Sequence, residues 1–350
     1  MRARLALVSV VAALGVLVPL AQGSSRGTGT RELRTQSLVS EISADGAHVA
    51  VDVYTGTDCD VISVWSPLTG ARRGIERSPF CADGAISGLA TLAGTRLLWQ
   101  DGESANSYTD YTVYTVDTRR RARPAALYAY EYTHDDYGNQ YYGPRAGPFA
   151  GHGSLLVFAT VVEHVSGTDT NARLWRVDGR RRTLIRRGID FTSLSVNGGR
   201  VAGAVADGPV LLLGADGHTI RALHPALRLV RVVVLQDHDL AAAGGGKVVV
   251  LDTNTGRVKG SRNLPPESRL EDYANGLAAL IHGNSIHVFR ISDGKDVVVA
   301  RPHGPGIFSA YIDAQIEPAG LFYTYTTETS CCQTGHVVFV PWKTLEQELR

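Results

Sequence analysis

The sequence lacks most of the features that would reveal a catalytic activity. It has no G-x-S-x-G turn between a strand and a helix, and no glycine-rich loop of the phosphate-binding kind. The four cysteines include no C-x-x-C pair, and no histidine lies close to Cys59 or Cys81, so a zinc site is not indicated. The net charge of +1 gives no overall preference for nucleic acid. What is present predicts an architecture and a binding face rather than a reaction.

The chain also has no apolar run beyond residue 20 that is long enough to span a membrane. Residues 1–23 instead have the pattern of a signal peptide. Two arginines precede an uncharged run over residues 5–20, and Ala21 and Gly23 supply the small residues of a cleavage site. An uncleaved signal anchor is the alternative. We therefore predict a secreted or extracytoplasmic protein of a bacterial cell envelope, since arginine greatly outnumbers lysine, as in GC-rich coding sequences.

Export would place the four cysteines in an oxidising compartment, where we expect them to be paired. The first hypothesis pairs Cys59 with Cys81 and joins the neighbouring Cys331 and Cys332. Adjacent Cα atoms are about 3.8 Å apart, so a disulfide between adjacent residues is strained. The alternative therefore links Cys59 and Cys81 to one each of Cys331 and Cys332.

One strand–turn–strand unit recurs along most of the chain. Residues 275–294 show it clearly, because their Asn-Gly and Gly-Asn corners, which accept positive φ at low cost, lie between apolar runs. The equivalent first turns are Asp45-Gly46, Ala93-Gly94, His152-Gly153, Gly198-Gly199, Asp237-His238, Asn275-Gly276 and Ala319-Gly320. An apolar strand and then an alternating strand follow each turn, and the units are about 36 to 61 residues apart.

Helical periodicity is almost absent, since only residues 344–349 could form a short helix. Seven strand-only units predict an all-β, seven-bladed β-propeller, in which each four-stranded sheet buries both faces against its neighbours. A β-sandwich is the alternative, but it does not need seven copies of one unit. We expect a single propeller domain over residues 31–350, after a flexible tail over residues 24–30. Residues 32–37 would close the ring as the outermost strand of the last blade; otherwise residues 344–349 would complete that blade.

Two short stretches resemble known propeller families. Residues 42–51, ISADGAHVAV, are similar to the S-P-D-G-x-x-I-A-F repeat of TolB-type, WD40-like propellers, with Ala44 at the position of that family's proline. Residues 251–256, LDTNTG, resemble the L-D-x-x-T-G turn of quinoprotein-type propellers. The docking tryptophan that follows the glycine in that family is absent here. The resemblance therefore implies the fold and not a quinone cofactor.

The predicted insertions all lie on one face of the ring. With strands named a to d from the axis outward, the b–c and d–a loops share one face, here the b–c/d–a face. The sequence predicts short b–c turns in blades 4, 5 and 6. It predicts long b–c loops in blades 1, 2, 3 and 7, at residues 55–60, 100–110, 163–171 and 326–335. The longest connection, residues 133–148, is a d–a loop on the same face, and we predict that this face binds a ligand.

The candidate ligand-binding residues are acidic, histidine and tyrosine side chains of these loops. They are Tyr108, Asp110, His134, Asp135, Asp136, Tyr137, Tyr141, Tyr142, Glu163 and His164. Carboxylates and tyrosine rings favour a cationic or hydroxyl-rich partner. Residues 134–140 carry enough oxygen atoms for calcium but lack the spacing of a dedicated calcium loop, so no cofactor is expected. Arginine clusters at residues 72–73, 119–123 and 180–182 fall on the opposite face, which we predict to be basic.

Two functions are compatible with these observations. We predict an exported, monomeric, non-catalytic propeller that binds a protein, peptide or glycan through its b–c/d–a face over blades 7, 1, 2 and 3. The alternative is a propeller enzyme, either a lyase, a hydrolase or a sugar oxidoreductase, with its site at the axial mouth of the same face. A cluster of buried charged groups with perturbed pKa values at that mouth would favour the enzyme.

Overall fold

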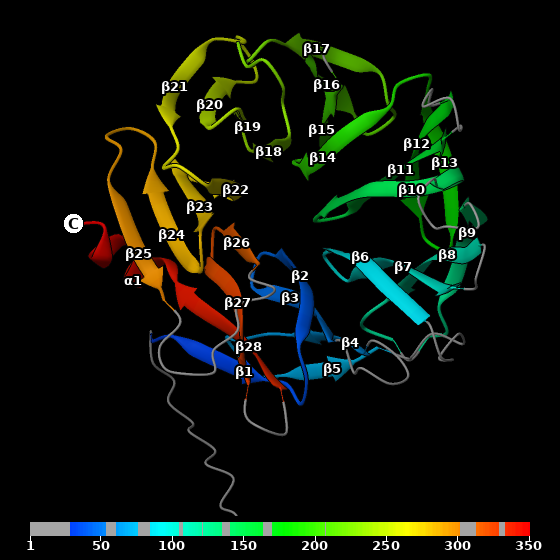
Figure 1. The fold of residues 1–350 in the computed structure, drawn as a ribbon, viewed down its shortest axis with the longest axis horizontal. Coiled ribbons are helices and arrows are strands. Elements are labelled where there is room, and N and C mark those ends of the chain that lie inside the picture. The colour runs from blue at the N-terminus through cyan, green and yellow to red at the C-terminus, as the bar shows by residue number, and fades with distance from the viewer. Residues whose placement is uncertain are drawn as a thin grey trace, which may run out of the picture.

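The chain forms a ring of seven four-stranded antiparallel blades around a central axis (Figure 1). The computed structural model describes residues 29–53, 61–75, 85–104, 108–120, 122–134, 141–163, 170–206, 208–301, 313–328 and 333–350. These residues form 28 strands and one short helix, α1 (Trp342–Glu348). Across the described ranges, no helix is long and apolar enough to cross a membrane. This is the all-β, seven-bladed propeller that the sequence and its resemblance to WD40-like propellers predict.

The blades follow the chain in order, and the first strand named in each lies nearest the axis. Blade 1 is β2 (Val39–Asp45), β3 (His48–Val53), β4 (Val61–Trp65) and β5 (Arg72–Gly74). Blade 2 is β6 (Ala85–Ala93), β7 (Arg96–Ser104), β8 (Tyr108–Asp117) and β9 (Ala125–His134). Blade 3 is β10 (Tyr141–His152), β11 (Leu155–Glu163), β12 (Thr170–Asp178) and β13 (Arg181–Arg187). Blade 4 is β14 (Phe191–Asn197), β15 (Arg200–Val205), β16 (Val210–Gly214) and β17 (Thr219–Leu223).

The second half of the ring repeats this order. Blade 5 is β18 (Val232–Gln236), β19 (Asp239–Gly244), β20 (Lys247–Asp252) and β21 (Val258–Asn263). Blade 6 is β22 (Ser268–Ala274), β23 (Leu277–His282), β24 (Ser285–Arg290) and β25 (Asp296–Ala300). Blade 7 is β26 (Ala314–Glu317), β27 (Gly320–Glu328), β28 (Gln333–Pro341) and, from the N-terminal end of the chain, β1 (Arg31–Arg34).

The hydrophobic core is divided into seven layers, one between each pair of neighbouring blades. Because side chains alternate along a strand, one strand supplies two layers. In β18, Val233 and Leu235 pack between blades 4 and 5, whereas Val234 packs between blades 5 and 6. Both faces of each blade are therefore apolar, which explains why the middle strands read as continuous runs of Val, Leu and Ala.

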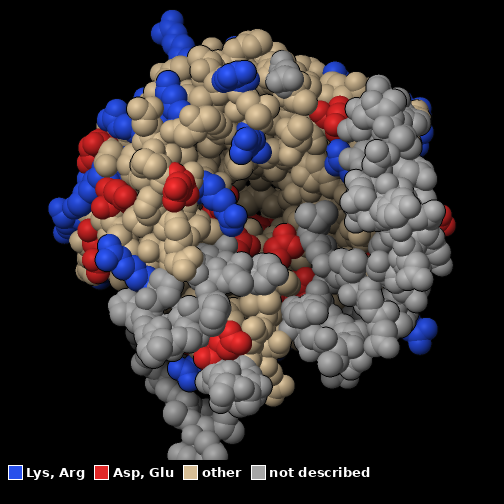
Figure 2. Space-filling model, viewed as in Figure 1, with Lys and Arg blue, Asp and Glu red and all other residues tan. Residues whose placement is uncertain are grey.

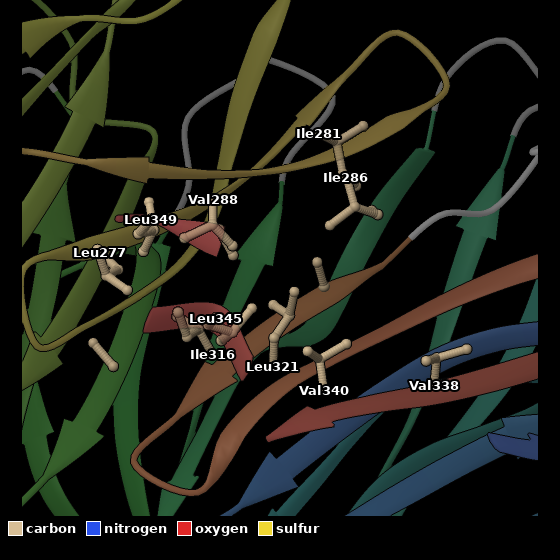
Figure 3. Close-up of a cluster of buried hydrophobic side chains, with 13 residues drawn as sticks. Leu277, Ile281, Ile286, Val288, Ile316, Leu321, Val338, Val340, Leu345 and Leu349 are labelled. Atoms are coloured by element: carbon tan, nitrogen blue, oxygen red, sulfur yellow. The ribbon is translucent and has the colours of Figure 1, made fainter. Parts of the chain in front are cut away.

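Helix α1 belongs to the layer between blades 6 and 7 (Figure 3). Its Leu345, together with Leu349 just beyond its end, is buried there with Leu277 and Val288 of blade 6 and Leu321 of blade 7. Residues 344–349 thus cover the edge of a layer as a helix, and the alternative in which they complete a blade is wrong. The N-terminal strand completes blade 7 instead.

The ring is closed by β1, as predicted. It pairs antiparallel with β28 from Arg31 opposite Phe339 to Arg34 opposite His336. The closing strand is Arg31–Arg34 rather than residues 32–37, because the chain bends away at Gln36 and Ser37, just after the Thr35 N–H donates to the Gly335 carbonyl at 2.8 Å. Glu32 Oε1 lies 2.5 Å from His336 Nδ1 and fixes the strand by its side chain as well.

Two predicted b–c loops are instead mostly extensions of the b and c strands. Segments 100–110 and 326–335 continue the β7–β8 and β27–β28 hairpins, whereas most of segment 163–171 lies outside the described residues. Their Thr and Tyr side chains have high strand propensity, which overrides the Asp, Glu and Gly residues that suggested loops. Likewise, the predicted loop 133–148 contributes most of its length to β9 and β10. These two strands pair at Thr133–Tyr142 and His134–Tyr141, so blades 2 and 3 form one eight-stranded sheet.

Removing β1 should destabilise the ring measurably. A chain that starts at residue 36 should lose about 3 kcal/mol of unfolding free energy relative to one that starts at residue 24, because it loses the β1–β28 hydrogen bonds and the packing of Leu33. Thermal denaturation of both chains, followed by circular dichroism, tests this. Equal melting temperatures would show that β1 does not close the ring.

Candidate functional site at the axial channel

A narrow channel runs along the axis of the ring. Its volume is about 220 Å³, and residues from the inner strands of all seven blades line it. Figure 2 shows the hollow end-on, with acidic side chains gathered on its rim. The inner strands approach the axis most closely, so the residues that decide the chemistry of the channel lie on β2, β6, β10, β14, β18, β22 and β26.

Polar side chains on these strands satisfy backbone groups of the next blade. An inner strand is the edge of its blade, so every second backbone N–H has no partner within its own sheet. Acceptor side chains of the preceding inner strand take these hydrogen bonds. Between blades 1 and 7 they join Ile42 N to Asp313 Oδ2 (3.1 Å), Ala44 N to Gln315 Oε1 (2.5 Å) and Gly46 N to Glu317 Oε2 (3.2 Å).

The same ladder of hydrogen bonds recurs at other junctions, and within each junction donor and acceptor are separated by the same number of residues along the chain. Between blades 1 and 2, three donors lie 49 residues after their acceptors: Ala90 N to Glu41 Oε2, Leu92 N to Ser43 Oγ and Gly94 N to Asp45 Oδ2. Between blades 4 and 5 the offset is 40 residues: Val233 N to Ser193 Oγ, Leu235 N to Ser195 Oγ and Asp237 N to Asn197 Oδ1. Every second residue of an inner strand therefore acts as an interblade hydrogen-bond acceptor at these junctions.

Asp45 ties three blades together at the a–b end of the channel. Its Oδ2 accepts a hydrogen bond from Gly153 N of blade 3 at 2.8 Å in addition to the one from Gly94 N of blade 2. The two glycines approach so closely that a Cβ on Gly94 would lie 2.5 Å from the Gly153 carbonyl oxygen. His152 Nε2 lies 3.6 Å from Asp45 Oδ1, so this histidine belongs to the a–b side, away from the predicted loops.

The channel is acidic on one side only. Six carboxylates come from the inner segments of blades 6, 7 and 1: Glu271, Asp272, Asp313, Glu317, Glu41 and Asp45. The opposite wall, from blades 2, 4 and 5, is lined by neutral polar groups: Thr91, Ser195, Asn197 and Gln236. Strand direction places Asp313, Glu271 and Glu41 near the b–c/d–a end, and Glu317 and Asp45 near the other end.

Enclosure raises the pKa values of four of these carboxyl groups, those of Glu271, Asp272, Asp313 and Glu317. Burial, with the nearby Asp313 charge, raises the pKa of Glu271 to about 7, although Arg269 Nε donates to Glu271 Oε1 and opposes the shift. Burial raises the pKa of Asp272 to about 7 despite hydrogen bonds from Tyr273 N at 2.8 Å and Ile316 N at 2.9 Å. Burial and the Asp272 charge raise the pKa of Glu317 to about 9, and burial raises that of Asp313.

The acidic wall was not predicted from the sequence. A signal was present, because Glu41-x-Ser43-x-Asp45 and Asp313-x-Gln315-x-Glu317 both alternate polar residues directly before an a–b turn. Such alternation also describes a strand with one solvated face. Only the ring shows that the polar face points to the axis.

The structure brings several of the predicted site residues to one end of the eight-stranded sheet. Tyr108 pairs with Thr133, Thr133 with Tyr142, and His134 with Tyr141, all at the b–c/d–a end of adjacent strands. Glu163 pairs with Gly143 on the next strand, and Asp110, which is exposed, pairs with Glu131. Asp135, Asp136, Tyr137 and His164 lie outside the described residues, as do Cys59, Cys81, Cys331 and Cys332. The ligand role, the calcium interpretation and the cysteine pairings therefore stay predictions.

Other aromatic and metal-binding possibilities are limited in the part of the chain that the structure describes. Tyr130 stacks on Tyr111, with ring centroids 5.3 Å apart, and its hydroxyl donates to Gln100 Oε1 at 2.7 Å, so it stabilises blade 2. Among the described residues, no three His, Cys, Asp or Glu side chains are grouped so that they could hold a metal ion.

Comparison with known proteins gives similarity in fold. No family model matches the chain, and no curated protein matches it. Sqt1 of Saccharomyces cerevisiae is 12% identical with a TM-score of 0.47, over 87% of this chain and 96% of Sqt1. BamB of Moraxella catarrhalis is 12% identical with a TM-score of 0.45, over 87% of this chain and 86% of BamB. The computationally designed Ika8 protein is 12% identical with a TM-score of 0.43, over 86% of this chain and 96% of Ika8.

The raised pKa values predict that stability falls as the pH rises. Between about pH 4 and pH 9 the folded protein binds more protons at Asp272 and Glu317 than the unfolded chain does, so the free energy of unfolding decreases with pH. Glu317→Gln keeps an acceptor for Gly46 N–H and removes the titration. We expect it to abolish on the order of 3 kcal/mol of the loss between pH 6 and pH 9. Urea denaturation at several pH values measures this, with the exposed Glu267→Gln as control; parallel pH curves for all three proteins would contradict it.

Proposed function

We propose that this protein is a non-catalytic binding propeller, exported from the cell, that takes a cationic group of a protein or peptide partner on its b–c/d–a face. The observation that carries the proposal is the acidic wall at the b–c/d–a mouth of the channel. Glu271, Asp313 and Glu41 come there from three blades that follow each other around the ring. Their shared negative charge favours a positively charged ligand.

The local contacts support a guanidinium or ammonium group as the part that is bound. Arg269 already places one guanidinium on Glu271, which shows that this corner of the mouth accommodates a cationic side chain. Asp272 and Asp313 carboxylates accept backbone N–H groups and are held in position by them. A bound cation would therefore meet carboxylates that are oriented beforehand, and would lose little side-chain entropy in doing so.

The predicted loop residues extend the same surface outward. Blades 7 and 1 belong both to the acidic wall and to the predicted loop-rich region over blades 7, 1, 2 and 3. Tyr108, Tyr141 and Tyr142 lie at the same end of the sheet formed by blades 2 and 3. Tyrosine rings there would add contact area for the rest of the partner.

Binding should depend on the carboxylates of the mouth and on pH. A fluorescein-labelled peptide of alternating lysine and serine should bind, and Glu41→Gln/Glu271→Gln should weaken it by about fivefold or more. Its affinity should rise from pH 6 to pH 8, because deprotonation of Glu271, with its pKa of about 7, restores the negative charge. Fluorescence anisotropy measures both effects. The matched control is Glu346→Gln/Glu348→Gln, two exposed residues of helix α1, which follows β28 on the opposite face. Equal losses in both variants would exclude the mouth as the site.

A second experiment addresses the loops without damaging the sheet. Replacing all of residues 133–148 would remove residues of β10 that pair with β11, so the exchange should cover residues 135–140 only, with Asn-Gly in their place. We expect a melting temperature within a few degrees of the original and a loss of affinity for a natural partner isolated by the intact protein. Unchanged affinity would show that this connection is not part of the binding surface.

A catalytic role is the second candidate, and one observation favours it. The pKa of Glu271, raised to about 7, is suited to general acid–base catalysis at neutral pH, as in a lyase, a hydrolase or a sugar oxidoreductase. Mass spectrometry of peptide and oligosaccharide mixtures after incubation with the protein would reveal products. Product formation that Glu271→Gln abolishes would replace the binding proposal with an enzymatic one.

A further inference from the structure

A second charged surface lies between the outer parts of blades 1 and 2. It is an open groove of about 710 Å³ between β5 and the segment that follows β8. Its lining consists of Arg72, Arg73, Gly74, Ile75, Val116, Arg120, Ala122 and Arg123. The turns that join c to d strands project on the face opposite the b–c/d–a loops, so this groove is separate from the acidic mouth.

Among the described residues, the arginine side chains of the groove outnumber the carboxylates near them, and Asp117 is the one whose pKa is lowered by the hydrogen bond from Arg119 and by the charges of Arg119 and Arg120. Arg72 Nε donates to Ser63 Oγ at 3.1 Å, a neutral partner. Asp117 is occupied by Arg119, whose Nη2 lies 3.1 Å from Asp117 Oδ2. Within the residues that the structure describes, no carboxylate lies within ion-pair distance of Arg73, Arg120 or Arg123.

A fifth arginine adds to this charge from blade 3. Arg180 Nη1 donates to the Arg123 carbonyl at 3.2 Å, so the turn of blade 3 extends the basic surface. Asp178, which precedes it, is paired with Arg176 at 2.8 Å. Several guanidinium groups that repel one another are therefore held around one concavity, as in a site for an anionic ligand.

The shape of the groove selects among anionic ligands. Ile75 and Ala122 are half-buried against the hydrophobic layer between blades 1 and 2, and with Val116 they form an apolar floor. The strand order places β5 outermost in blade 1, so its outer edge is unpaired in the described sheet. A recessed floor beside a free strand edge fits an extended chain better than it fits a flat bilayer surface.

We propose that this groove binds an extended acidic peptide segment of a partner protein, laid along the free edge of β5. Acidic side chains of the segment would pair with Arg73, Arg120 and Arg123, and its apolar side chains would contact Ile75 and Val116. Guanidinium groups bind carboxylates through two parallel N–H···O hydrogen bonds, which fixes the orientation of the segment as well as its charge. The protein would thereby hold an acidic partner on one face and a cationic partner on the other.

The test uses a fluorescein-labelled peptide of alternating glutamate and valine as its probe. We expect anisotropy to show binding at low salt, and Arg120→Glu/Arg123→Glu to weaken it by about tenfold or more. The matched control is Arg228→Glu/Arg257→Glu, which makes the same charge change at exposed residues of other blades. The control should retain affinity within about twofold. Because all four side chains are exposed, circular dichroism should show unchanged folding.

Further measurements distinguish an acidic peptide from other anionic ligands, and the groove from the acidic mouth. Inorganic pyrophosphate and vesicles of phosphatidylcholine and phosphatidylglycerol should bind less tightly than the peptide. Tighter binding of either, or equal losses in the two double variants, would overturn the proposal. Glu41→Gln/Glu271→Gln should leave the affinity for the acidic peptide unchanged. The groove and the acidic mouth can therefore fail independently.

Discussion

The fold depends on how the inner strands satisfy their unpaired backbone N–H groups. Seven strand edges meet around one axis, where a continuous hydrogen-bonded barrel does not form, and each unpaired buried N–H would cost free energy. The chain solves this with side chains. Asp, Glu, Gln, Ser and Asn at every second inner position accept the N–H groups of the next blade, with offsets of 271, 49 and 40 residues at three junctions. The hydrophobic layers outside this ladder can pack because the blades are held in register at the axis.

The choice of acceptor determines the chemistry of the channel. The junction between blades 4 and 5 uses neutral Ser and Asn, whereas the junctions of blades 6, 7, 1 and 2 use carboxylates together with the neutral Gln315 and Ser43. Both kinds satisfy the backbone, so the fold alone does not require the charges. Burial makes the charged acceptors costly, as the raised pKa values of Asp272 and Glu317 show. Neutral acceptors satisfy the same N–H groups without this cost, so the carboxylates agree with the proposed binding of a cationic group.

Local features such as the a–b turns could be predicted from the sequence, whereas features that depend on closure of the ring, such as the acidic wall, could not. All seven a–b turns were placed correctly, because Gly, Asn and, in blade 5, Asp237 adopt positive φ there and mark a hairpin wherever it occurs. The acidic wall could not be assembled in the same way, since Asp313 meets Ile42 at a distance of 271 residues along the chain. The β7–β8 hairpin was predicted too short, since residues 100–110 were expected to be a loop; in the structure Gly102 lets the backbone of Asp110 on the facing strand come close.

The closing strand and the acidic wall are connected at the same seam. Blade 7 contains the first described strand of the chain, β1, and it also supplies Asp313, Gln315 and Glu317 to the ladder. Residues 35–38 lead from β1 in blade 7 directly into β2 in blade 1, so the chain itself joins these two blades, and the two ends of the propeller meet within blade 7 where β1 pairs with β28. The acceptors between blades 7 and 1 carry pKa values above the usual carboxyl range. Because protonation removes the repulsion among these carboxylates, the proton occupancy of Asp313 and Glu317 links the integrity of the ring to the charge presented at its axis.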